Sequence, residues 1–181
     1  MKKQKGFSLI ELLIVVAIIL IIAAIAVPNL LRSRMAANES SAAGSLRTIS
    51  SANVTYSTTY GVGFAGAMLA LGCGAGCPAA PPVAGSANAD LIDSVLASTT
   101  PVIAKSGYTF AYLATNPVPA TNLQNNSYGV VGTPASLNVT GVSFFCVDQS
   151  NVIRRENPGL SATAVAGNPI TCPLASLALG N

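Results

Sequence analysis

One uninterrupted apolar stretch near the N-terminus constrains this chain more than any other feature. From Phe7 to Val27 every residue is apolar except Ser8 and Glu11. A helix of that length would measure about 31 Å, and the hydrocarbon core of a bilayer is about 30 Å thick. The stretch therefore predicts a membrane-crossing helix. It could be a cleaved signal peptide, a permanent anchor, or a helix that is kept after a shorter leader has been removed.

A conventional signal peptide has support in the sequence, but two features count against it. A basic segment precedes the stretch, and Ala24-Ile25-Ala26 would serve as a small-x-small cleavage site. The stretch is, however, longer than the roughly 7–15 residues usual in signal peptides. Glu11 also lies inside it, although an ionisable side chain costs roughly 2.5–3.5 kcal/mol at the centre of a membrane helix and less near its end. Neither a signal peptide nor a plain anchor gains anything from Glu11.

The net charge of +3 has a local origin. Three lysines lie ahead of the stretch, and from Phe7 onward six basic residues balance six acidic ones. The charge therefore does not indicate nucleic acid as a partner. The lysines favour a cytoplasmic N-terminus by a small margin only, because Arg32 and Arg34 follow the stretch.

The residues at the start of the stretch resemble a known processing site. Lys5-Gly6-Phe7-Ser8-Leu9-Ile10-Glu11 is similar to the prepilin peptidase site of type IV pilins and pseudopilins. That family has a short basic leader ending in Gly, then Phe, Ser or Thr, an aliphatic pair, and Glu at the fifth mature position. The resemblance covers residues 1–60 strongly and the rest in general plan. It implies a leader of residues 1–6, cleavage after Gly6, and N-methylation of Phe7 by a prepilin peptidase and methyltransferase.

The resemblance also implies that Glu11 acts in filament assembly, and the chemistry of the cleaved end agrees. Cleavage would leave a cationic amine on Phe7, one helical turn from Glu11. In a bundle of such helices, the carboxylate of one subunit can pair with the amine of its neighbour, which fixes the axial register between subunits. The alternative is that Glu11 pairs only with the amine of its own chain.

The helical pattern continues well beyond the apolar stretch, which predicts one helix over residues 7–60. Pro28 should kink the helix without ending it, and Gly61 should end it. The family often has a glycine in the first half of this helix, but this chain has none between Phe7 and Gly44, so melting near Pro28 is less expected here. An apolar stripe follows, made of Leu31, Met35, Ala42, Leu46, Ile49, Tyr56 and Tyr60. Asn53 interrupts this stripe and should find a partner in the head.

Residues 61–181 predict a globular head. Residues 61–105 are rich in Gly, Ala and Pro and should form a connection that contains one short helix capped by Asp90. The strand signals that follow have no helices between them, which argues for an antiparallel sheet and an α+β fold like that of type IV pilins. The expected strands are 108–113, 127–131, 142–147 and 152–155, with a turn at 148–151.

Four cysteines, an even number, suit an oxidising compartment. Their spacing fits zinc poorly, and no metal or cofactor is expected. We predict a local disulfide between Cys73 and Cys77, with a redox-active pair as the less favoured alternative. We also predict a Cys146–Cys172 disulfide that holds the C-terminal tail against the sheet and resembles the C-terminal disulfide loop of many type IV pilins. A loop of that length would gain about 3 kcal/mol.

No motif in the sequence carries catalysis. The chain has no His and few carboxylates, so an acid–base site or nucleophile triad has little to build from, and we do not expect an enzyme. It also lacks a phosphate-binding loop, so the ATPase and platform that drive assembly must be separate proteins.

The function expected from the resemblance is a structural subunit of a type IV pilus. It would cross the inner membrane once and then assemble into a surface filament that serves adhesion, twitching motility or DNA uptake. One alternative is a periplasmic pseudopilin of a type II secretion system. Another is a minor pilin that binds a ligand through Arg154 and Arg155.

Overall fold

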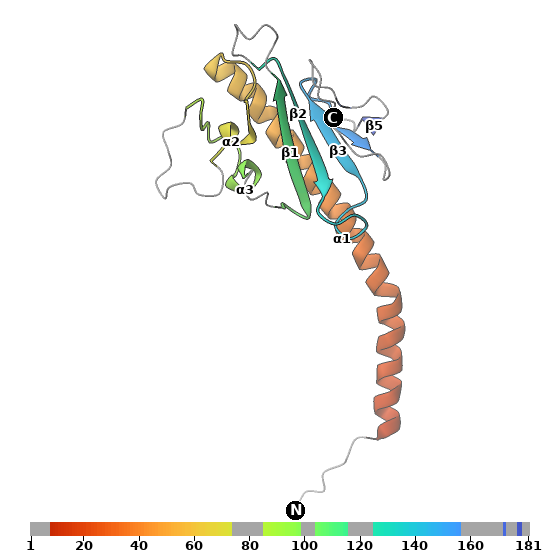
Figure 1. Ribbon diagram of the computed structural model, residues 1–181. Coiled ribbons are helices and arrows are strands. Elements are labelled where there is room, and N and C mark those ends of the chain that lie inside the picture. Colours follow the sequence, from red (N-terminus) through yellow and green to blue (C-terminus); the bar gives the residue numbers. More distant parts are fainter. Residues whose placement is uncertain are drawn as a thin grey trace, which may run out of the picture. The chain divides into compact units, whose positions relative to one another are not determined.

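The computed structural model describes residues 8–73, 85–98, 104–115, 125–156, 172 and 177–178. Its contacts divide the chain into two compact units, Met1–Arg34 and Met35–Asn181. A single helix, α1 (Leu9–Tyr60), supplies the described helical residues of the first unit and the first element of the second. Figure 1 shows the second unit as a sheet with α1 lying against one face.

The predicted helix is confirmed, with its start shifted by two residues. It begins at Leu9 rather than Phe7, continues through Pro28 and ends at Tyr60. Gly61 follows in the left-handed region, with φ +64°, and its N–H donates to Ser57 O at 3.1 Å. Glycine adopts this conformation without a Cβ penalty, which explains why the helix ends there.

In addition to α1, the described residues of the second unit form two one-turn helices and five strands. Their bounds are α2 (Met68–Leu71), α3 (Ser94–Ala97), β1 (Tyr108–Thr115), β2 (Ser127–Pro134), β3 (Phe144–Asp148), β4 (Arg154–Glu156) and β5 (Leu177–Ala178). The strands pair antiparallel in the order β1-β2-β3-β4-β5, which confirms the α+β prediction. The sequence did not predict α2 or β5.

Two of the predicted strands begin later than expected. Residues Val142 and Ser143 precede β3 because their N–H groups donate to Glu39 of α1 and not to a neighbouring strand. The last predicted strand begins at Arg154 rather than Val152. The turn between them is confirmed, with Asn151 N donating to Asp148 O at 2.9 Å.

The predicted cap of the short helix was wrong. Asp93, not Asp90, caps α3, and its carboxylate accepts bonds from Val95 N and Leu96 N, each at 3.1 Å. Leu91 cannot continue a helix from Asp90, because its N–H donates to Leu71 O at 2.7 Å and joins the segment to α2.

The main core lies between α1 and the sheet. Leu46, Ile49 and Tyr56 from α1 are buried there against Tyr128 and Val147 of the strands. The stripe begins later than predicted, because Leu31 is 51% exposed and the first buried stripe residue is Ala42. A second, smaller cluster contains Val131, Cys146 and Cys172. These alternate along β2 and β3 with residues of the main core, so they lie on the opposite face of the sheet.

Candidate functional site

The N-terminal end of α1 is organised by one carboxylate. Ser8 lies just before the helix, and its carbonyl accepts a bond from Leu12 N at 3.3 Å. Its own N–H donates to Glu11 Oε2 at 3.0 Å. This is the half of a capping box that an acid in the third helical position provides. Glu11 therefore satisfies a donor that the helix leaves without an intrahelical partner.

The rest of this unit is a helix with apolar side chains on every side. No residue of α1 from Leu9 to Arg34 is buried, and Leu9, Ile21 and Ile25 are each more than 60% exposed. By length and composition α1 could cross a membrane, and no part of its most apolar window is buried inside the protein. A helix that is hydrophobic all round is covered by lipid or by other helices. Within the described residues, nothing covers this one.

Glu39 joins the other half of α1 to the head. Its Oε1 accepts bonds from Val142 N at 2.9 Å and Ser143 N at 3.0 Å, and its Oε2 pairs with Arg155 Nη2 at 3.1 Å. Nearby, Asn38 Nδ2 donates to Thr140 O at 2.8 Å. These bonds attach the start of the packed part of α1 to β4 and to the segment between β2 and β3.

The predicted partner of Asn53 is present, and there is more than one. Asn53 is fully buried. Its Oδ1 accepts bonds from Tyr112 Oη at 2.8 Å and Ala65 N at 3.3 Å, and its Nδ2 donates to Ile49 O at 3.2 Å. A buried amide without partners would be costly, so this set explains how the stripe tolerates a polar residue. One side chain thus joins the helix, the connection and β1.

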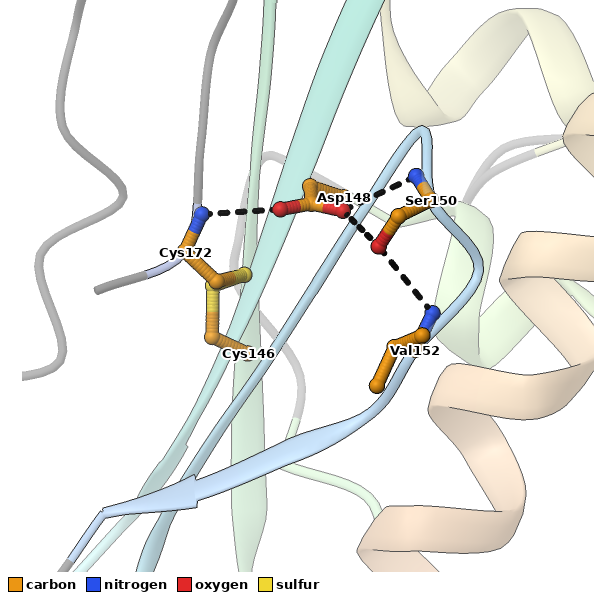
Figure 2. Close-up of a disulfide and its surroundings, with 5 residues drawn as sticks. All are labelled: Cys146, Asp148, Ser150, Val152 and Cys172. Atoms are coloured by element: carbon orange, nitrogen blue, oxygen red, sulfur yellow. Dashed lines mark hydrogen bonds between the residues drawn. A yellow bond between two sulfur atoms is a disulfide. The ribbon is translucent and has the colours of Figure 1, made fainter. Parts of the chain in front are cut away.

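The Cys146–Cys172 disulfide is confirmed, and Figure 2 shows the carboxylate that supports it. Asp148 Oδ2 accepts a bond from Cys172 N at 2.9 Å. Its Oδ1 accepts bonds from Ser150 N at 2.9 Å and Ser150 Oγ at 2.5 Å. Asp148 therefore holds both the β3–β4 turn and the return of the tail, as the dashed lines in Figure 2 trace.

The other predicted site residues divide into two groups. Gly6, Phe7 and Cys77 lie outside the described residues. Cys73 is disulfide-bonded, and its predicted partner is Cys77. These bonds exclude a zinc site on all four cysteines, because zinc binds free thiolates.

Of the two arginines predicted to bind a ligand, Arg154 and Arg155, the second is engaged in contacts within the head. Arg155 pairs with Glu39, and its Nε donates to Ser143 Oγ at 2.7 Å. Arg154 is half-buried, and its Nε is buried without a hydrogen-bond partner. The two side chains alternate along β4 and so lie on opposite faces of the sheet. They do not form one binding surface.

The N-terminal motif and the fold can now be compared with those of known proteins. A family model described as the prokaryotic N-terminal methylation motif matches residues 1–27. That motif, followed by one long helix and an antiparallel sheet, is typical of type IV pilins, and the chain is similar to the type IV pilin family in these features. Members of this family are structural subunits rather than enzymes.

One relative is similar over part of the chain. It is the type IV wide pilus major component PilA4 of Thermus thermophilus, which is 62% identical over 39 residues. These residues are 22% of this chain and 30% of the relative, so the similarity spans less than a third of the relative's length. No solved structure matches the chain.

Proposed function

We propose that this chain is a structural subunit of a type IV pilus, cleaved after Gly6 and N-methylated on Phe7. The leader of residues 1–6 is removed on the cytoplasmic side of the inner membrane, where residues 7–27 anchor the chain. The subunit then moves from the membrane into a surface filament driven by a separate ATPase. The observation that carries the proposal is the exposed apolar surface of α1 from Leu9 to Arg34, which needs lipid before assembly and other helices after it.

The head supports a pilus over a secretion pseudopilus. The Cys146–Cys172 bond closes a C-terminal loop, and secretion pseudopilins that resemble this length class usually lack such a loop. A surface filament is also exposed to oxidising surroundings, in which a disulfide persists. Adhesion, twitching motility and DNA uptake are all compatible with such a filament.

The first test is electron microscopy of sheared surface material together with mass spectrometry of the subunit's N-terminus. We expect long fibres whose chains begin with methylated Phe7. Chains that begin at Val27 would instead mean an ordinary signal peptide. Short periplasmic assemblies without surface fibres would mean a secretion pseudopilin.

The second test separates the two roles open to Glu11. Glu11→Ala removes both the charge and the bond from Ser8 N, whereas Glu11→Gln keeps an acceptor for that bond and removes only the charge. We expect both variants to be cleaved normally and to assemble poorly, because the charge would pair with the Phe7 amine of the next subunit. Normal filaments from Glu11→Gln would show that Glu11 only caps its own helix.

A further inference from the structure

The head has few charged residues, and nearly all its acids are used internally. Glu39 pairs with Arg155, and Asp93 pairs with Lys105 at 2.5 Å. Asp148 holds the disulfide region, and Glu156 is 4% exposed. Asp90 is left. It is exposed, and within the described residues it makes no hydrogen bond or ion pair.

The same inventory of the basic residues leaves one arginine. Lys105 and Arg155 are paired, and Arg154 is half-buried. Arg47 of α1 is exposed, and its side chain too has no hydrogen bond or ion pair in the described part of the chain. After internal pairing, the described head therefore presents one exposed carboxylate and one exposed guanidinium that remain available.

Arg47 lies beside a groove. The groove has a volume of about 380 Å³ and runs along α1 next to β3 and β4. Small side chains at successive turns of the helix, Ala36, Ser40 and Ala43, line one side, and Phe145 and Arg155 line the other. Glu39 also lines the groove, and its charge is paired with Arg155. Positions four and three residues apart lie on one helix face, so these small residues leave a shallow recess that a loop can enter.

Asp90 lies on the opposite flank of the head. The bonds of its neighbours, Ala89 N to Ala70 O at 2.9 Å and Leu91 N to Leu71 O at 2.7 Å, hold it against α2. In Figure 1, α2 and α3 lie beside β1, at the other end of the strand order from β4. Asp90 has φ +51°, a conformation that Asp and Asn tolerate better than other side chains do. Asp90 is exposed, whereas the adjacent Ala89 is buried.

We propose that Arg47 of one head pairs with Asp90 of a neighbouring copy, which docks against the groove. The two residues lie on different flanks of one molecule, so the contact joins unlike surfaces and can repeat without closing. Such an arrangement builds a filament rather than a dimer. This inference rests on the proposed pilus function and specifies one contact between its heads. An exposed ion pair of this kind sets orientation more than affinity.

The test uses full-length chains and measures the fraction of subunits recovered in sheared filaments. Arg47→Gln and Asp90→Asn each remove one charge, and the asparagine keeps the tolerance for positive φ. We expect each to lower the assembled fraction roughly threefold, the scale of one exposed ion pair. Thr55→Glu is the matched control for Arg47→Gln, because it changes the net charge equally at an exposed α1 position away from the groove. It should assemble normally.

A charge exchange tests the pairing directly. Arg47→Glu and Asp90→Lys should each assemble worse than the neutral variants, and the double variant should recover much of the loss. Thermal unfolding of each variant checks that the head is still folded. If filaments of the unaltered chain never form, both the proposed function and this contact are overturned. If they form and the single variants assemble normally, only the contact is overturned. If Arg47→Glu lowers the assembled fraction and Asp90→Asn does not, the groove has another occupant, and the proposed contact is again overturned.

Discussion

The two halves of α1 belong to one helix but have opposite relations to the rest of the molecule. From Leu9 to Arg34 no residue is buried, although the side chains are almost all apolar. From Ala42 to Tyr56 nine residues are buried, and three of them, Ser50, Asn53 and Tyr56, form hydrogen bonds with the head. The first half therefore depends on contacts that other molecules supply, while the second half has most of its contacts within the chain. The comparison predicts that substitutions in the first half reduce filament assembly, whereas substitutions in the second half destabilise the head.

The largest effect should come from truncating a core side chain of the second half. Leu46 is fully buried, and Leu46→Ala should lower the free energy of unfolding by about 3 kcal/mol, because it removes apolar contacts and leaves a cavity. Ile14→Ala, at a position 53% exposed in the first half, should leave the head's unfolding unchanged and reduce filament assembly instead. Chemical denaturation of the full chain in detergent measures the first effect. Equal destabilisation by both variants would contradict the comparison.

The next effect concerns the disulfide that closes the head's tail. Cys146 and Cys172 are 26 residues apart, and replacing both with Ser should cost about 3 kcal/mol through the greater freedom of the unfolded chain. The double replacement of Cys73 and Cys77 serves as the comparison, because a much shorter loop restricts fewer unfolded conformations. Thermal unfolding should rank the first pair well above the second. The reverse ranking would mean that the tail contributes little to the head.

Asn53 tests whether the polar contacts of the second half matter beyond its apolar ones. Asn53→Ala should cost about 2 kcal/mol, because it leaves Ala65 N buried without its acceptor. Ser51→Ala, on the exposed side of the same helix, should be neutral within experimental error. The two variants are compared by denaturant midpoint. A stable Asn53→Ala head would show that packing alone holds the helix in place.

The smallest effect should be a pH dependence confined to the head. Glu156 is 4% exposed, and both of its carboxylate oxygens are buried without a hydrogen-bond partner. Burial raises the pKa of Glu156 above its ordinary value of 4.5. Its stabilising contribution is therefore complete below pH 4.5 and is lost as the pH rises through the raised pKa. Glu156→Gln should be more stable than the unaltered head at neutral pH and should flatten this dependence in melting curves. A steeper curve would contradict the assignment.

The sequence predicted the long helix and the sheet because their signals are local. Its stripe contained two gaps of seven residues, from Met35 to Ala42 and from Ile49 to Tyr56. Glu39 and Asn53 fill these gaps at helical spacing, and the structure shows both facing the head. The sequence predicts a partner in the head for Asn53, which interrupts the stripe, but it does not single out Glu39. In a chain with so few charges, an acid on the buried side of a helix was the signal that could have revealed the contact between Glu39 and the head.

What the sequence could not predict depends on contacts between distant segments. Asp90 and Asp93 are equivalent as helix caps, and the bond from Leu91 N to Leu71 O decides between them. Likewise, β5 has two residues, and only its pairing with β4 makes it a strand. The N-terminal apolar stretch, by contrast, was predictable from the sequence. Its motif, its length and its exposed surface all indicate a helix that is covered by lipid or by other helices.

The polar contacts along α1 have a mechanical consequence. An apolar helix face alone can slide on a sheet by one turn, about 5.4 Å, and find similar contacts again. The bonds of Asn38, Glu39, Ser50 and Asn53 lie along about 22 Å of the helix and match specific groups in the head. A pull along the helix axis must therefore break them nearly together, so the load is shared in shear. Such a joint transmits tension from the helix to the head without slipping.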